Sequence, residues 1–394
     1  MRYIKAFVLA AALALTACSE SSSEGYVDVG ELEESLEAAN TREIADTVET
    51  FDRGLVFLNW GYSFSDKEFI LSEGQGIRKR IDLSNGMISS LCDIPACAHD
   101  EEISKDCFEY RPVNSFTPTR DGMYFTDFEK NGRLILRRDG REETVYTNTY
   151  YDELDEKLEP EGKSAFRFFY RDGLFYLFGQ DWFYTVDAAT MQQQCDPVKL
   201  SSSPIWNADV WGELLYITNE DMELICYNMK TGELTKLGDR VSRIQACEEG
   251  LYYLSPYQNE AGDWRFALSL CDHGSARGNE LLDDILISFF VTDENVYYMK
   301  PDGVYIYSKE SGESERLPLA YTYENGYKYK FSDYSHMVSC PSSEYVYVLS
   351  YNIDTGSEWT NTLFRIKKDT AEFEVISLGI YYQAWDAEPE ILSY

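Results

Sequence analysis

The densest group of residues that could do chemistry is a run of three cysteines and one histidine. Cys92, Cys97, His99 and Cys107 follow the spacing C-x4-C-x-H-x7-C. Thiolate and imidazole are preferred ligands of Zn²⁺, and a site filled by four protein ligands is structural, since a catalytic zinc keeps an open position. The alternative is a disulfide within the run, such as Cys97 with Cys107, as in many secreted proteins. Both interpretations stay open, and one structural zinc is the only cofactor we expect.

Five further cysteines are scattered over the rest of the chain. Most lie in or beside apolar segments that resemble strands. A cysteine outside a metal site or disulfide behaves as a small buried hydrophobe. We expect that role for Cys195, Cys226, Cys247, Cys271 and Cys340.

Patterns that would indicate an enzyme are weak. Residues 352–359 resemble the Asp-box of sialidases, but Asn352 stands where that motif has Ser or Thr, and the string occurs once. Residues 312–316 lack the last glycine of a G-x-S-x-G nucleophile elbow. With three histidines in the whole chain, chemistry built on several His ligands is nearly excluded. Acid–base catalysis by two carboxylates stays open, because sequence cannot show which acidic side chains converge.

The first 17 residues are typical of a secretory signal. Arg2 and Lys5 precede the apolar run 6–17, which is too short to span a bilayer comfortably. The sequence Leu15-Thr16-Ala17-Cys18 then resembles the lipobox of bacterial lipoproteins. That resemblance implies that Cys18 carries a diacylglycerol group and begins the mature chain. We therefore expect a protein anchored by lipid to the cell membrane, facing the extracytoplasmic side.

Residues 18–46 are expected to separate the lipid from the folded domain. Ser19 to Gly25 is polar and small, as in a flexible spacer. Residues 31–46 are acidic with apolar residues at roughly helical spacing, which predicts a short amphipathic helix. The sequence thus divides into a signal peptide (1–17), a lipidated tether with a helix (18–46) and a domain (47–394).

That domain is a repeat. A turn signal followed by an aromatic strand recurs at intervals of about 48 residues. Each copy has a short apolar strand upstream and two strands downstream, joined by turns such as Thr231-Gly232. Four-stranded antiparallel units repeated radially are the blades of a β-propeller, in which the aromatic strands pack between blades. We predict an all-β, seven-bladed β-propeller, closed by segments near 48–51 and 381–394. The seven aromatic copies begin at Gly54, Gly122, Gly173, Glu213, Gly250, Asn295 and Glu344.

Composition limits the partners. The 69 acidic residues against 35 Lys and Arg give a formal net charge of −34. Nucleic acid is therefore not expected as a partner, because binding phosphates needs an excess of Lys and Arg. Aromatic residues make up 15% of the chain, which argues against disorder despite the charge.

The lipobox, the acidic Ser-rich tether and the divergent blades together resemble the secreted β-propeller lipoproteins of gut Firmicutes, broadly TolB-like. The resemblance covers most of residues 50–394 and implies a surface-anchored binding module with no catalytic residues to carry over. We expect a monomer that binds a protein or carbohydrate ligand through its central funnel or through the long connections 92–113 and 147–164.

The alternative is a glycan-active enzyme, a hydrolase or lyase, that uses carboxylates in the propeller funnel. Carboxylates about 5–10 Å apart beside an exposed tryptophan would favour it. The tryptophans that could act as sugar platforms are Trp60, Trp182, Trp206, Trp264 and Trp359.

Overall fold

The computed structural model describes most of residues 167–317 and 335–380, together with separate strands and a few single residues between 56 and 147. All of them belong to one compact unit, 46–394. The described residues contain no helix long and apolar enough to cross a membrane. Several predicted features lie outside the described residues: the signal peptide, Cys18, the helix at 31–46, the closing segments 48–51 and 381–394, Trp60, His99 and Cys340.

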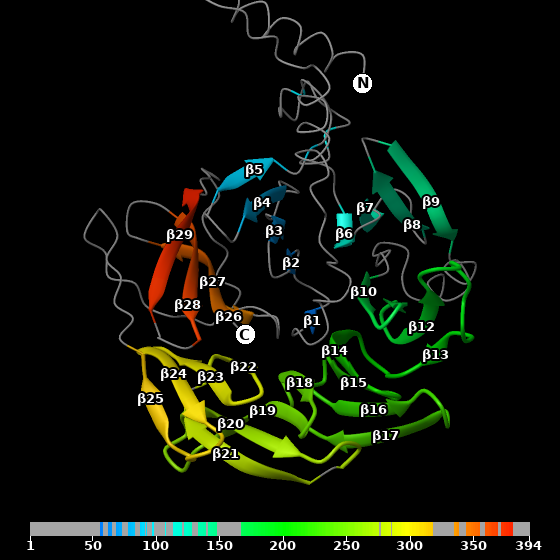
Figure 1. Ribbon diagram of the computed structural model, residues 1–394. Helices are drawn as coiled ribbons and strands as arrows, with labels where there is room; N and C mark the ends of the chain where they lie inside the picture. Colours follow the sequence, from blue (N-terminus) through cyan, green and yellow to red (C-terminus); the bar gives the residue numbers. More distant parts are fainter. Residues whose placement is uncertain are drawn as a thin grey trace, which may run out of the picture. The chain divides into compact units, whose positions relative to one another are not determined.

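The described strands form seven antiparallel sheets (Figure 1). Each contains four consecutive strands, and one of them has β1 as an additional fifth strand. Sheet 1 contains β2 (Tyr62–Phe64), β3 (Glu68–Ser72), β4 (Arg78–Asp82) and β5 (Ile88–Ser90). Sheet 2 contains β6 (Val113–Thr119), β7 (Gly122–Asp127), β8 (Arg133–Arg138) and β9 (Arg141–Thr147). Sheet 3 contains β10 (Arg167–Arg171), β11 (Leu174–Phe178), β12 (Trp182–Asp187) and β13 (Val198–Lys199).

The remaining four sheets follow the same order along the chain. Sheet 4 contains β14 (Ile205–Trp211), β15 (Leu214–Asn219), β16 (Leu224–Asn228) and β17 (Glu233–Gly238). Sheet 5 contains β18 (Arg243–Cys247), β19 (Gly250–Gln258), β20 (Trp264–Cys271) and β21 (Gly278–Asp284). Sheet 6 contains β22 (Ser288–Val291), β23 (Asn295–Lys300), β24 (Gly303–Ser308) and β25 (Ser314–Arg316). Sheet 7 contains β26 (Ser335–Val338), β27 (Tyr345–Asp354), β28 (Trp359–Lys367) and β29 (Phe373–Ile380).

The first strands of successive sheets are neighbours. Strand β2 contacts β6, β6 contacts β10, and β14, β18, β22 and β26 follow in the same way. Side chains of β10 hydrogen-bond to β14 and complete the series. Seven four-stranded sheets arranged side by side by their first strands are the blades of a β-propeller, so the predicted fold class is confirmed.

Six of the seven predicted aromatic strands are the second strands of their sheets, and the first prediction is wrong. Val56–Phe57 forms β1, which pairs with β14 and adds a fifth strand to sheet 4. The second strand of sheet 1 is β3, which follows Ser65-Asp66-Lys67 without a glycine. The glycine-aromatic pattern therefore missed β3 and selected a segment whose partner lies far away in the sequence.

Aromatic side chains fill the spaces between successive sheets, as the sequence predicted. Phe175 of β11 is fully buried in a cluster that draws on sheets 2 and 3. Its ring lies 4.9 Å from that of Tyr124 on β7. Corresponding clusters join sheets 3 to 4, 4 to 5, 5 to 6 and 6 to 7. The core is thus a series of layers between blades.

Phe175→Ala tests this packing. Removing a buried ring leaves a cavity between sheets 2 and 3, so we expect a loss of about 3–5 kcal/mol in the free energy of unfolding. Leu234→Ala on the outer strand β17 is the control, because its side chain is 46% exposed, and it should cost about 0.5 kcal/mol or less. Equal losses in denaturant unfolding would contradict the layered core.

Candidate functional site

Among the described sheets, the strand ends at which the connections begin and end lie at one edge of the sheets. Neighbouring first strands run parallel, because residues near the start of one contact residues near the start of the next. Arg167 Nη2 donates to the carbonyl of Ile205 (2.9 Å), and Asn207 Nδ2 donates to the carbonyl of Ser242 (2.9 Å). In a four-stranded meander, the starts of strands one and three share an edge with the ends of strands two and four. We call this edge the connection face.

Three of the connections at this face are long. They span 91–112, 148–166 and 317–334, whereas the others span only 200–204, 239–242 and 285–287. The first two are the connections predicted as contact loops. The third was not predicted, because its tyrosine-rich sequence resembles the aromatic strands and left the repeat interval nearly normal. Long connections on a rigid scaffold are where binding residues most often lie.

Two exposed tryptophans lie at the connection face. Trp206 is the second residue of β14 and is 41% exposed, and Trp264 is the first residue of β20 and is 58% exposed. They belong to the adjacent sheets 4 and 5. Trp359 begins β28 at the same edge. Trp182, also predicted as a platform, is buried and stacks on Tyr184.

The Asp-box-like string has the position that the sequence predicted. Asn352 to Asp354 end β27 and Trp359 begins β28, so the string spans the hairpin between the second and third strands. The Asp-box belongs between the third and fourth strands. The position gives no support to a sialidase-like role.

The first strands join the blades through polar side chains. Asp209 is buried and accepts hydrogen bonds from Arg171 Nη1 (2.5 Å) and from the backbone N–H of Ala246 (2.7 Å). It therefore links sheets 3, 4 and 5. Gln245 exchanges two hydrogen bonds with the backbone of Val291 in sheet 6 (2.8 and 2.9 Å).

Two further hydrogen bonds join the first strands of sheets 5, 6 and 7. Ser288 Oγ accepts a hydrogen bond from Arg243 in sheet 5 and another from the backbone N–H of Met337 in sheet 7 (3.1 Å). Burial lowers the pKa of Arg167 to about 10. The side chains of Asp209, Gln245 and Ser288 are therefore engaged in holding the sheets together, whereas Nε and Nη2 of Arg171 are buried without a hydrogen-bond partner.

Asp209 is the one carboxylate among the described first strands. Its oxygens are already bonded, and its side chain is 1% exposed. A glycosidase acid–base pair needs two carboxylates about 5–10 Å apart beside the sugar. These strands do not supply such a pair.

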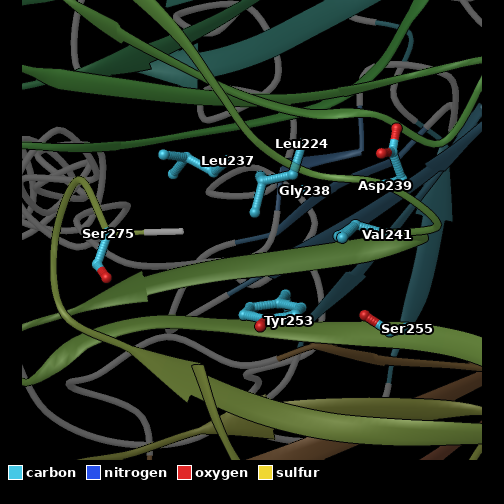
Figure 2. A pocket seen from close by; sticks show the side chains of 8 residues that line it. All are labelled: Leu224, Leu237, Gly238, Asp239, Val241, Tyr253, Ser255 and Ser275. Carbon is cyan, nitrogen blue, oxygen red and sulfur yellow. The ribbon is translucent and has the colours of Figure 1, made fainter. Parts of the chain in front are cut away.

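A pocket lies between sheets 4 and 5 (Figure 2). Leu224, Val241 and Tyr253 contribute to its wall, with Asp239 at one end. Its volume is about 100 Å³, whereas sites for small-molecule ligands usually measure about 300–1,000 Å³. It is too small to serve as the main ligand site.

The cysteine run lies in the connection between sheets 1 and 2. Cys92 comes two residues after β5, and Cys107 comes six residues before β6. The sulfur atoms of Cys92, Cys97 and Cys107 all lie within 4.8 Å of one another. Cys107 is 1% exposed, and the other two are half-buried. The structure thus brings together three of the four residues predicted as a unit.

The cysteines outside the run behave as expected where they are described. Cys226, Cys247 and Cys271 are buried, and Cys195 is half-buried. Burial raises the pKa of the Cys226 and Cys271 thiols to about 11. The spacing of these cysteines along the sequence suggests one cysteine per blade, but this is wrong, because Cys247 and Cys271 both belong to sheet 5.

No protein-family model matches the chain, and no curated protein matches it. Among solved structures, the computationally designed protein Ika8 is 11% identical, with 85% of this chain and 89% of Ika8 covered and a TM-score of 0.46. KlHsv2 with a replaced loop is 10% identical, with 83% and 99% covered and a TM-score of 0.44. PorZ of Porphyromonas gingivalis, a surface component of the type-IX secretion system, is 11% identical, with 82% and 45% covered and a TM-score of 0.40. At these values the likenesses carry no functional argument, and the fold assignment rests on the strand pairing above.

Proposed function

We propose that this protein is a binding or scaffold module that contacts its ligand through the connection face, with Trp206 and Trp264 as the central contacts. The observation that carries the proposal is the exposure of both indoles at one edge of adjacent sheets. Tryptophan combines a large apolar surface with a polar N–H, and it is enriched at the energetic centres of interfaces. Its flat ring suits a sugar face or an apolar side chain of a partner protein.

The polar side chains of the first strands favour binding over catalysis, because they already bond to neighbouring sheets and are not available to act on a substrate. Their amide and hydroxyl groups bond to neighbouring sheets, and their one described carboxylate is buried in an ion pair. The exposed Trp206 and Trp264 meet one condition of the glycan-active alternative, but the described first strands do not supply the carboxylate pair that it also requires.

The lipobox-like sequence supports the rest of the proposal. A lipid on Cys18 would hold the chain at the extracytoplasmic side of the cell membrane, and the acidic spacer after it would let the propeller reach partners. This arrangement is the one implied by the resemblance to TolB-like propeller lipoproteins of gut Firmicutes. The propeller would then act as a monomer that presents the connection face.

Hydroxyl-radical footprinting on intact cells tests the binding face. Trp206 and Trp264 should be oxidised several-fold more slowly on cells than in the purified protein, because a bound ligand covers them. Met87 is a matched control within the chain, since it is 65% exposed and lies in the hairpin between β4 and β5, at the opposite edge. Its oxidation rate should not change. Oxidation is read by mass spectrometry.

A second control distinguishes shielding by a ligand from shielding by the membrane. The lipidated protein on liposomes of phosphatidylglycerol should show no slowing at Trp206 or Trp264. The binding proposal is contradicted if the two tryptophans are oxidised equally fast on cells and in solution, or if Met87 alone is shielded.

Cys18→Ser tests the anchor. The variant has no thiol to acylate, so we expect the protein to move from the membrane fraction to the soluble or secreted fraction and to lose incorporation of labelled palmitate. Cys195→Ser is the control, and it should stay at the membrane. Retention of the Cys18→Ser variant at the membrane with the same label would contradict lipidation at this residue.

A further inference from the structure

Three sulfur atoms converge within the connection between sheets 1 and 2. The Sγ atoms of Cys92, Cys97 and Cys107 are mutually within 4.8 Å, although the three residues are spread over sixteen positions of the chain. A disulfide needs only two sulfurs, at about 2.05 Å from each other. Three sulfur atoms this close together are what a metal ion with three thiolate ligands requires. In a tetrahedral zinc site with Zn–S bonds of about 2.3 Å, the sulfurs lie roughly 3.8 Å apart.

The burial of these residues fits an enclosed ion. Cys107 has almost no exposed surface, and Cys92 and Cys97 are half-buried. An ion held among them would be shielded on the side of Cys107. The sequence offers His99, two residues after Cys97, for a fourth position.

The chain positions also fit a structural role. Cys92 lies just after β5 and Cys107 shortly before β6, so one ion would join the two ends of a long connection. A cross-link that closes a loop lowers the conformational entropy of the unfolded chain and thereby stabilises the folded state. A structural zinc stabilises by a different route: the folded chain binds it and the unfolded chain does not, so the free energy of binding adds to the free energy of folding.

We propose that Cys92, Cys97 and Cys107 bind one Zn²⁺ ion that holds the connection between sheets 1 and 2. Thiolate ligands select soft or borderline ions, of which Zn²⁺ needs no redox partner. Each thiol gives up its proton on binding, so the site releases up to three protons as the ion enters. The inference does not depend on the proposed ligand-binding function, because a structural ion would be present whatever the connection face contacts.

The test is the metal content of the full chain carrying Cys18→Ser, purified without chelator under anaerobic conditions. Plasma mass spectrometry should find about one zinc per chain. Cys92→Ser and Cys97→Ser should each reduce the zinc bound at a limiting free Zn²⁺ concentration at least about tenfold. Cys195→Ser, a half-buried cysteine outside the run, should leave it unchanged.

Two further measurements support the test. The first shows whether each variant is folded, and the second detects thiolate ligands without relying on the zinc content after purification. Cys226 and Cys271 should stay unreactive toward iodoacetamide in every variant that retains the native fold, because both are buried. Replacing zinc by Co²⁺ should give the visible and near-ultraviolet absorption of tetrahedral thiolate ligation, and this absorption should weaken in Cys97→Ser.

Three results would overturn the proposal. The first is a chain without zinc in which two of the three thiols react only after a reductant is added, since that identifies a disulfide. The second is a chain that takes up neither Zn²⁺ nor Co²⁺ while all three thiols are reduced. Retention of zinc in both Cys92→Ser and Cys97→Ser would likewise place the ion elsewhere.

Discussion

The buried ion pair between Arg171 and Asp209 is the constraint on which the described architecture most depends. Two charges removed from water are costly unless each is closely paired, and Asp209 is satisfied only when β10, β14 and β18 lie side by side in one register. Apolar packing between sheets is less directional and tolerates small shifts. The polar contacts therefore align the first strands, while the aromatic layers supply most of the driving force.

Parallel alignment of the first strands has a direct functional consequence. It brings the described strand ends at which the connections begin and end to the same edge, together with Trp206 and Trp264. The first strands serve mainly to join the blades. Strand β1 pairs with β14 on the side that faces away from β15. Under the proposed function, structure and recognition belong to different parts of the molecule: the first strands hold successive blades together, and the connection face contacts the ligand.

Much of the fold could be predicted because its determinants are local. A glycine or turn followed by alternating aromatic residues marks β7, β11 and β19 directly in the sequence. Strand β3 could not be found this way, because the polar sequence Ser65-Asp66-Lys67 precedes it in place of a glycine. Strand β1 was misassigned because strand pairing over about 150 residues of separation leaves no local signal.

In the candidate site, too, features with a local sequence signal could be predicted and features set by distant contacts could not. The spacing of Cys92, Cys97 and Cys107 marked them as one candidate cluster for a metal or a disulfide, and the structure places their sulfur atoms within 4.8 Å of one another. By contrast, nothing in the sequence distinguished the exposed Trp206 and Trp264 from the buried Trp182, because exposure depends on which sheets meet. Asp209 was one acidic residue among 69, and its role depends on contacts with two other sheets.

The most direct test of the central claim is the stability of Asp209→Asn in denaturant unfolding. The substitution keeps the side-chain shape but leaves Arg171 as a buried unpaired charge, so the account predicts a loss of about 3–5 kcal/mol. The exposed pair Lys230–Glu213 is the reference, and Glu213→Gln should cost about 1 kcal/mol or less. A loss for Asp209→Asn as small as that of the exposed pair would contradict the claim that this contact aligns the blades.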